Sequence, residues 1–418
     1  MKSNLFTLCA VVGTALMSHS VSAFSALSKT NVVNYWGQNS VSSVGGTETD
    51  LVNYCQDDTV DVFVVAFVYQ IQNNMPVLNL ANHCGDTFSN GLLNCPKVGQ
   101  DIKACQANGK KVIISVGGAT GAYSLPDAAS GQAFADNMWD TFLGGSSSTR
   151  PFGDAIVDGV DLDLESGSNA GYVQFIASLR TKFAAQSSKN YYITSAPQCP
   201  YPDQATQAAL ASSWFDMVWV QFYNNYCGVQ SYGTGNFNFD TWNNWATSVS
   251  LNKDVRILLG VPGGPGGAGS GVISASTLNT ILNGIKSYSN FGGVMMWDAG
   301  IAQQSGLAAS AAQFLHGSIT VTTTVTTTAT ATATATKTIT ATTVTATKTI
   351  TTTAPATSTT PAGSGSCAGV AAWDSSKVYA TAGTKVTYNG HLWTNQWWTQ
   401  GDTPSGVTWS VWVDGGAC

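Results

Sequence analysis

The chain has 418 residues, a net charge of -6 and a pI near 5.0, and only 10% of its residues are charged. So few Lys and Arg argue against nucleic acid or an anionic membrane as the partner, and we expect neither. Trp, Tyr and Phe (13, 14 and 16) outnumber Lys and Arg (17 together). Flat aromatic faces with polar edges suit sugar rings, although most of these rings will belong to the core.

Residues 1–23 have the pattern of a secretory signal peptide. Lys2 precedes the apolar run LFTLCAVVGTALM, and VSA at 21–23 fits the rule for cleavage before Phe24. The run is short for a membrane span. We therefore expect a secreted, extracellular protein, free or associated with a cell wall.

Removal of this segment leaves eight of the nine cysteines. An even number in a secreted chain indicates disulfide bonds. The sequence has no CxxC pair and its four histidines are scattered, so we expect no metal site and no cofactor.

The composition changes abruptly at residues 318–366, which are rich in Thr and Ala and end in Pro, Gly and Ser. In a secreted protein this is typical of a disordered, O-glycosylated linker. It divides the chain into a large domain at 24–317 and a small one at 367–418.

Eight apolar runs in the large domain alternate with segments that are mostly long enough for helices. This pattern predicts an α/β fold, a (β/α)8 barrel, and a doubly wound sheet is the alternative. Several runs end in polar or Gly-rich groups, which would meet at the carboxyl end of a barrel, where active sites lie. The runs are 31–37, 61–69, 111–118, 159–165, 191–198, 217–223, 256–263 and 292–300.

The fourth run, DGVDLDLE, concentrates four acids in eight positions. Apolar residues alternate with Asp161, Asp163 and Glu165, so the acids share one face of a strand about 6.6–7 Å apart. Asp158 is out of phase and is expected at the start of the strand. Glu165 comes last and lies nearest the mouth of a barrel.

Two such carboxylates repel by about 2.5 kcal/mol at an effective dielectric constant near 20, so at least one proton should be retained near neutral pH. A protonated carboxyl group beside an ionised one is the equipment of glycoside hydrolysis. An exposed acidic strand edge and a calcium site are the alternatives, but calcium needs more oxygen ligands in a flexible turn.

DGVDLDLE matches the DxxDxDxE signature of family 18 glycoside hydrolases, and KVIISVGG matches the SxGG motif of that family. NYWGQN, VWVQFYNN and GVMMWD resemble the first, sixth and eighth strands of its plant- and fungal-type (class III) chitinases. The resemblance covers residues 30–315. It implies a TIM barrel that cleaves β-1,4-linked N-acetylglucosamine polymers by a retaining, substrate-assisted route, in which the N-acetyl oxygen of the substrate is the nucleophile.

The resemblance also assigns roles to residues of this chain. Glu165 matches the proton donor and Asp163 the acid that holds the acetamido N–H. Asp161 and Asp158 match acids that hold a proton behind them, and Tyr223 matches the phenol that donates to the acetyl oxygen. The positions that match the lining of the cleft are Tyr35, Gly118, Ala119, Gln221 and, as the floor, Trp297.

The same resemblance suggests disulfide bonds Cys55–Cys105, Cys84–Cys95 and Cys199–Cys227. Only about 30 residues separate the seventh and eighth runs, where bacterial-type relatives insert a whole domain. The missing insertion implies an open groove and internal (endo) cleavage.

The C-terminal domain holds eight Trp and Tyr residues in about fifty positions. The stretch YNGHLWTNQWWTQGDTPS resembles the carbohydrate-binding modules of family 5/12, small β-rich domains that bind chitin or cellulose. Trp397, Trp398 and Trp412 are the predicted exposed stacking rings, although adjacent Trp397 and Trp398 should face opposite ways on a strand. A Cys367–Cys418 bond would join the ends of so small a domain.

We therefore expect a secreted, monomeric endochitinase with a chitin-binding module, whose partners are chitin and chito-oligosaccharides. One alternative is a catalytically inactive sugar-binding or inhibitor protein with the same barrel. The other is an endo-β-N-acetylglucosaminidase that acts on N-glycans. The presence of Glu165, Asp163 and Tyr223 disfavours the inactive protein, and the chitin-type module disfavours the N-glycan enzyme.

Overall fold

The computed structural model describes residues 24–317, except 57 and 120, and, in the C-terminal segment, 367, 369–379, 383–395, 399–400, 403–404 and 412–418. The chain divides into two compact units at Gly317, and we describe each by itself. The predicted signal peptide and linker lie outside the described residues.

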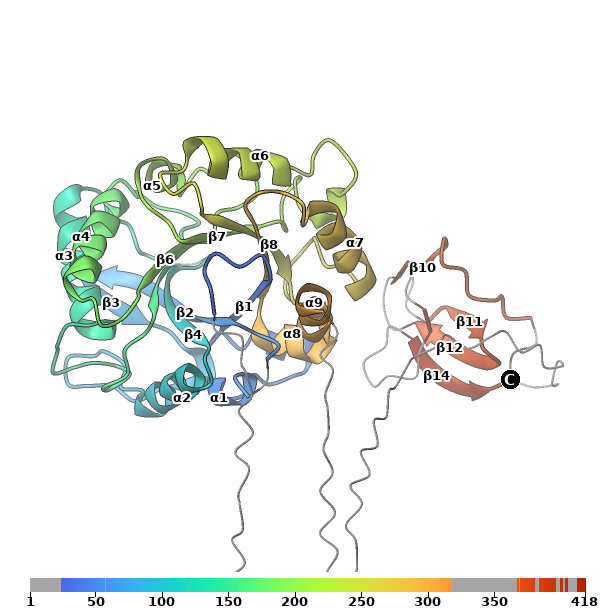
Figure 1. Cartoon of the computed structure of the whole chain (residues 1–418). Coiled ribbons are helices and arrows are strands. Elements are labelled where there is room, and N and C mark those ends of the chain that lie inside the picture. Colours follow the sequence, from blue (N-terminus) through green and yellow to red (C-terminus); the bar gives the residue numbers. More distant parts are fainter. Residues whose placement is uncertain are drawn as a thin grey trace, which may run out of the picture. The chain divides into compact units, whose positions relative to one another are not determined.

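The first unit is a closed barrel of parallel strands (Figure 1). The first strand pairs with both its successor and the last strand, which closes the sheet. All eight predicted strands are present, so the expected (β/α)8 barrel is confirmed. The strands are β1 (Asn31–Trp36), β2 (Val62–Gln72), β4 (Lys111–Gly117), β5 (Gly159–Asp163), β6 (Tyr192–Ser195), β7 (Met217–Gln221), β8 (Arg256–Pro262) and β9 (Phe291–Trp297).

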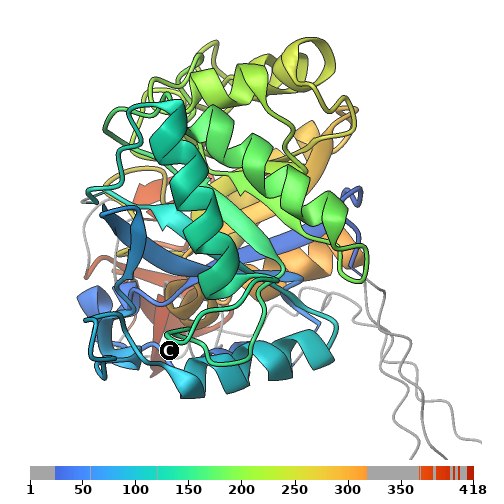
Figure 2. The ribbon, with the colours of Figure 1, turned by 90° about the vertical axis from the view of Figure 1, so that its left-hand side faces the viewer.

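Helices cover the outside of the barrel (Figures 1 and 2). Two of them, α3 and α4, lie side by side, and the rings of Phe134 and Phe175 stack between them at 5.2 Å. The helices are α1 (Leu51–Tyr54), α2 (Pro96–Ala107), α3 (Ala128–Phe142), α4 (Tyr172–Ala185), α5 (Gln207–Ser212), α6 (Phe239–Asn244), α7 (Ala275–Ile285), α8 (Ala299–Ser305) and α9 (Leu307–His316), with short turns η1 (Ser40–Val44), η2 (Ala81–His83), η3 (Val229–Ser231) and η4 (Trp245–Val249).

One strand was not predicted. β3 (Met75–Leu78) runs antiparallel to the end of β2. Asn73 and Asn74 join the two strands with φ angles of 52° and 61°, a left-handed conformation that Asn tolerates and that tight hairpins require. The hairpin places Asn79 beside Phe67, with which it exchanges backbone hydrogen bonds.

Side chains alternate between two cores, as the period of two requires. On β5 and just after it, Val160, Leu162 and Leu164 join the outer core between sheet and helices. Asp161 and Asp163 point into the barrel. The inside is filled by a smaller apolar cluster that includes Tyr35 and Trp219. Asp161 and Asp163 therefore lie in a barrel whose interior is filled by apolar side chains.

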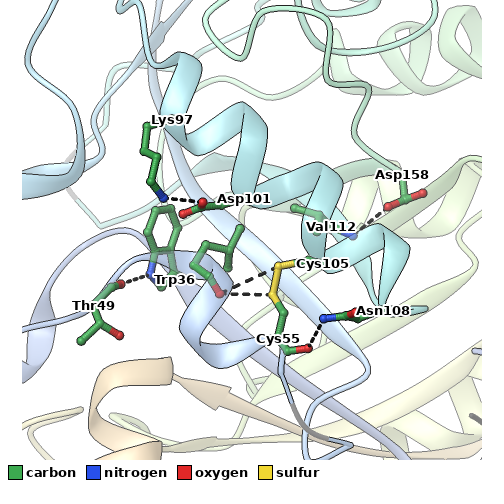
Figure 3. The surroundings of a disulfide bond; sticks show 10 residues. Trp36, Thr49, Cys55, Lys97, Asp101, Cys105, Asn108, Val112 and Asp158 are labelled. Atoms are coloured by element: carbon green, nitrogen blue, oxygen red, sulfur yellow. Dashed lines mark hydrogen bonds and ion pairs between the residues drawn. A yellow bond between two sulfur atoms is a disulfide. The ribbon is translucent and has the colours of Figure 1, made fainter. Parts of the chain in front are cut away.

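All four predicted disulfide bonds are confirmed: Cys55–Cys105, Cys84–Cys95, Cys199–Cys227 and Cys367–Cys418. The first ties the end of α1 to α2 (Figure 3). The third joins the loops that follow β6 and β7 and therefore fixes two loops on the rim of the barrel.

The second unit contains a small antiparallel sheet (Figure 1). Its aromatic core includes Tyr379, Trp393 and Trp412. Trp412 is only 2% exposed and its ring lies edge-on to Tyr379 at 5.1 Å, so the prediction that it is an exposed stacking ring is wrong. Trp397 and Trp398 lie outside the described residues. The strands are β10 (Val378–Tyr379), β11 (Lys385–Tyr388), β12 (His391–Asn395), β13 (Thr399–Gln400) and β14 (Trp412–Ala417).

Candidate active site

The innermost acid, Asp161, is completely buried and fully hydrogen-bonded. The Tyr35 hydroxyl and Ser115 Oγ each donate to Asp161 Oδ2 at 2.7 Å, and Thr194 Oγ1 donates to Oδ1 at 2.8 Å. Strands on both sides of β5, and β1 across the barrel, therefore hold this carboxyl group in one orientation.

The second acid, Asp163, lies one step nearer the mouth. Gln221, at the end of β7, donates from Nε2 to Asp163 Oδ1 at 2.8 Å and to the carbonyl oxygen of Ala196 at 2.9 Å. Because both hydrogens of the Gln221 amide are used, the orientation of Gln221, and with it that of Asp163, is fixed.

The third acid, Glu165, follows the end of β5 and is only partly buried. Its backbone N–H donates to the Tyr123 hydroxyl at 2.9 Å, and that hydroxyl donates to the carbonyl oxygen of Gly118 at 2.9 Å. Tyr123 thus joins the loops that follow β4 and β5.

Burial and mutual repulsion raise the pKa values of these acids. Burial raises the pKa of Asp163 well above its ordinary value, and the charges of Glu165, Asp161 and Asp203 raise it further. Burial also raises the pKa of Glu165, with Gln198 opposing the shift and Asp203 adding to it. The raised pKa values of Asp163 and Glu165 favour retention of a proton by this pair, which is the direction that the sequence pattern predicted.

The acids open into a cavity of about 280 Å³ at the carboxyl end of the barrel strands. Of the predicted catalytic residues, Asp163, Glu165 and Tyr223 line the cavity. The predicted lining residues found there are Gly118, Ala119, Gln221 and Trp297.

Tyr223 lies in the cavity wall close to two acids. Burial, and then the negative charges of Asp163 and Glu165, raise the pKa of its phenol well above the ordinary value. The hydroxyl therefore stays protonated at neutral pH, and it is available as a hydrogen-bond donor.

The two glycines of SVGG bring the backbone of β4 close to the acids. A Cβ on Gly117, whose φ is 137°, would lie 1.8 Å from the carbonyl oxygen of Asp163. A Cβ on Gly118, whose φ is 93°, would lie 3.0 Å from the ring of Phe67. Only glycine fits both positions, and the Gly118 N–H donates to the Asp163 carbonyl oxygen at 2.9 Å.

Two predicted site residues lie elsewhere. Asp158 precedes β5, at the opposite end from Glu165, and its carboxylate pairs with Lys189 Nζ at 2.7 Å. It also accepts from the Val112 N–H at 2.8 Å (Figure 3). Its role among the catalytic acids is therefore wrong, since its odd phase turns it away from the barrel interior. Tyr35 is 1% exposed and lies beneath the cavity, where it supports Asp161 instead of lining the cleft.

Several residues of the site were missed by sequence reasoning. Most of them lie on loops or on the unpredicted hairpin, where no periodic pattern marks the side chains that face a cavity. Three of them stood in a motif that we singled out: Gln38 in NYWGQN, Gly117 in KVIISVGG and Asn224 in VWVQFYNN. The missed lining residues are Gln38, Phe67, Tyr69, Asn79, Gly117, Asn224 and Gly267.

The described part of the chain contains no cluster of three or more His, Cys, Asp or Glu that could hold a metal ion. Nor does any helix among those residues combine the length and apolar character needed to span a bilayer.

A (β/α)8 barrel with converging, proton-retaining acids on its fourth barrel strand defines the class of barrel glycoside hydrolases. Residues 31–264 match the model of glycosyl hydrolases family 18, and residues 372–413 match that of carbohydrate-binding module family 5/12. The chain belongs to glycosyl hydrolase family 18.

Named relatives agree with this assignment. The chain is 48% identical over 280 residues to chitinase 2 of Rhizopus oligosporus and 45% identical over 281 residues to an endochitinase of Saccharomyces cerevisiae. Each alignment covers 66% of this chain but only 50% and 48% of those relatives, so the chain spans about half of their length. The crystal structure of a chitinase from Ipomoea carnea is similar to this chain, with 32% sequence identity and a TM-score of 0.59. The alignment covers 68% of this chain and 99% of the Ipomoea carnea chain.

Proposed function

We propose that this protein is a secreted endochitinase that hydrolyses internal β-1,4 linkages of N-acetylglucosamine polymers. The observation that carries the proposal is the convergence of Glu165, Asp163, Gln221, Tyr223 and Trp297 on one cavity. Chitinases among the relatives support the choice of substrate.

Glu165 is the proposed general acid. It protonates the glycosidic oxygen as the bond to the anomeric carbon breaks, and the leaving sugar departs as an alcohol. The carbonyl oxygen of the substrate's N-acetyl group attacks the anomeric carbon and forms a cyclic oxazolinium ion. Ionised Glu165 then takes a proton from water, whose oxygen opens the ring with net retention.

Asp163 is the proposed partner of the acetamido N–H. Its carboxylate accepts that hydrogen, turns the acetyl oxygen toward the anomeric carbon and offsets the positive charge that develops on the ring. The fixed amide of Gln221 supports this orientation. Tyr223, whose phenol stays protonated, donates to the acetyl oxygen, and Trp297 provides a flat floor for the sugar.

The substrate is bound by two units in this proposal. The barrel cleaves single chains, and the family 5/12 module holds the enzyme on insoluble chitin, which raises the local enzyme concentration. The family match at 372–413 supports the module's role. A signal peptide at 1–23, a glycosylated linker at 318–366 and a monomeric state complete the proposal.

The test is an assay of the full chain on colloidal chitin, chitohexaose and a high-mannose glycoprotein. We expect soluble oligomers of mixed length from chitin and no release of N-glycans. Binding of chitohexaose without hydrolysis would support an inactive sugar-binding protein instead. Cleavage of the glycoprotein alone would support the N-glycan enzyme.

A further inference from the structure

A second group of buried acids lies behind the cleft, and nothing above uses it. Glu48 is 2% exposed. Its Oε2 accepts hydrogen bonds from the Gly37 N–H at 2.9 Å and the Asn39 N–H at 3.0 Å. His83 Nε2 lies 2.9 Å from the same oxygen.

Gln38, which lines the cavity, is the residue between these two N–H groups. The contact is reciprocal, because the Glu48 N–H donates to Asn39 Oδ1 at 2.8 Å. Gly37 and Asn39 have φ angles of 117° and 51°, so the loop turns sharply on both sides of Gln38. Glu48 is therefore the side chain that closes this turn.

A second carboxylate attaches the same loop to the floor of the cleft. Asp298 directly follows Trp297, and its Oδ2 accepts from the Ser40 N–H at 3.2 Å. Its Oδ1 accepts from the Ile301 N–H at 3.1 Å and caps α8. Burial, and then the charge of Glu48, raise the pKa of Asp298 to about 6, so the two carboxyl groups interact.

The burial of Glu48 destabilises the folded protein. Glu48 Oε1 is buried and has no hydrogen-bond partner, and an unpaired buried oxygen of this kind destabilises a protein. The neighbouring His83 is fixed against Trp36 with ring centroids 4.2 Å apart, and Trp36 donates to the Thr49 carbonyl oxygen (Figure 3). A rigid group that costs stability beside a cavity indicates a functional requirement.

Side-chain length also points to Glu48. Among 23 acidic residues the chain has only two glutamates, Glu48 and Glu165. Asp298 makes comparable contacts with backbone N–H groups through a side chain that is one methylene shorter. At position 48 the oxygen has to cross from a neighbouring loop, since Gly37 and Asn39 lie nine to eleven residues away.

We propose that Glu48 is a positioning residue for the sugar-binding cleft. Its carboxylate holds Gln38 in place through the backbone N–H groups of the residues on either side of Gln38. Together with Asp298, Glu48 fixes this loop beside Trp297. Glu48 does not line the cavity and contacts no substrate. The inference rests on the proposed function, because the ligand that Gln38 and Trp297 face is taken to be a chito-oligosaccharide.

The test compares three substitutions by kcat and KM on chitotetraose. Glu48→Ala removes the acceptor, Glu48→Asp keeps the charge but shortens the reach, and Glu48→Gln keeps the reach but removes the charge. We expect Ala and Asp to raise KM about tenfold or more with kcat and its pH profile nearly unchanged. Gln should restore KM to within about threefold of wild type.

Asp50→Asn is the matched control, since Asp50 is a half-exposed carboxylate two positions away that pairs with Lys97 and does not line the cavity. Its KM should equal that of wild type. Gln38→Ala should raise KM as Glu48→Asp does, and the double variant should show less than the sum of the two effects. Binding of chitotetraose, measured in the Glu165→Gln background, should weaken by the same factor as KM rises.

A wild-type KM in Glu48→Ala and Glu48→Asp would overturn the proposal, and so would a loss of kcat without a change in KM. Failure of both variants to fold would also overturn it, because Glu48 would then be a stability residue. Full additivity with Gln38→Ala would overturn it as well. An inactive wild-type chain that still binds chitotetraose would contradict the proposed function but leave the binding test of Glu48 intact.

Discussion

Asp161 and Asp163, on β5, and Glu165, which follows it, are all carboxylic acids, but their surroundings differ. Asp161 receives three side-chain hydrogen bonds, which lower its pKa and partly offset the effect of burial. Asp163 receives one side-chain hydrogen bond and faces the charges of its neighbours, so its pKa rises well above the ordinary value. Burial raises the pKa of both acids, and the rise is larger for Asp163, which lies nearer the cavity.

The first prediction concerns the proposed general acid. Glu165→Gln keeps the shape of the side chain but cannot donate an acidic proton, so kcat on chitohexaose should fall by about 10²–10⁴-fold. Oligosaccharide binding, measured by calorimetry, should stay near wild type. Turnover within a few-fold of wild type would mean that another group protonates the leaving oxygen.

The second prediction concerns Asp203, a buried acid that accepts from the Thr206 N–H at 2.7 Å and from the N–H groups of Gln198 and Ala205. Its negative charge raises the pKa of Glu165. Asp203→Asn removes that charge, so the pKa of Glu165 should fall and its acid form should be lost at lower pH. The basic limb of the kcat/KM profile should move to lower pH, and an unmoved limb would show that the two groups are not coupled.

Sequence reasoning could locate the acids because alternation with Val and Leu determines which side chains share a face. It could not locate Glu48, Asp203 or Gln38, since each depends on which backbone N–H groups a loop presents. Asp158 is the converse case, a residue that sequence reasoning placed at the site but that lies away from it. It belongs to the matched motif, but the phase of the strand turns it toward Lys189 and away from the site.

At the scale of elements, strand ends and the loops between them make the cleft. β4 ends in Gly117, which lets the strand approach Asp163. β9 ends in Trp297, and the Asp298 that follows joins the cleft floor to α8. Disulfide Cys199–Cys227 fixes the loops after β6 and β7. The cleft therefore consists of loops that are each tied to a neighbour.

Asp298 gives a test at this scale through the pH dependence of stability. Its pKa in the folded protein is about 6, above its ordinary 3.8, so it stabilises the folded form fully below pH 3.8, and this contribution is lost as pH rises through 6. Two pKa units correspond to about 3 kcal/mol. Asp298→Asn removes this titration.

Between pH 4 and pH 7 the unfolding free energy of Asp298→Asn, relative to wild type, should therefore rise by about 2 kcal/mol. Any loss of stability because Asn makes poorer hydrogen bonds than Asp is independent of pH, so it cancels when the two pH values are compared. Urea unfolding at the two pH values measures the difference. Parallel pH dependence in both proteins would show that Asp298 does not titrate in this range.

The order of barrel strands was predictable because each strand is an apolar run bounded by polar or Gly-rich residues. The β2–β3 hairpin was not, since MPVL is short and its Asn-Asn turn lacks the Gly of a strong hairpin signal. That omission also hid Asn79, which the hairpin brings to the cavity.

The whole chain combines a barrel with a separate small unit, each with its own core. Burial of Trp412 removes one of three predicted stacking rings, because a domain of this size needs large side chains for its own core. Sequence alone could not distinguish a core tryptophan from an exposed one. Trp397 and Trp398 stay predicted as candidates for stacking.

Deletion of residues 318–418 tests the division of labour between the two units. The barrel core lies entirely before Gly317, so kcat and KM on chitohexaose should stay near wild type. Adsorption to insoluble chitin, and its degradation, should fall. If the shortened chain adsorbs to chitin as well as the full chain does, the C-terminal unit is not the chitin-binding module.

The most direct test of the central claim is a proton NMR time course of chitohexaose cleavage by the full chain. The account predicts cleavage at internal linkages and a new reducing end that appears first as the β anomer, because the acetamido mechanism retains configuration. Glu165→Gln should leave the spectrum unchanged over the same period. First products in the α configuration, or release of terminal units only, would contradict a retaining endochitinase.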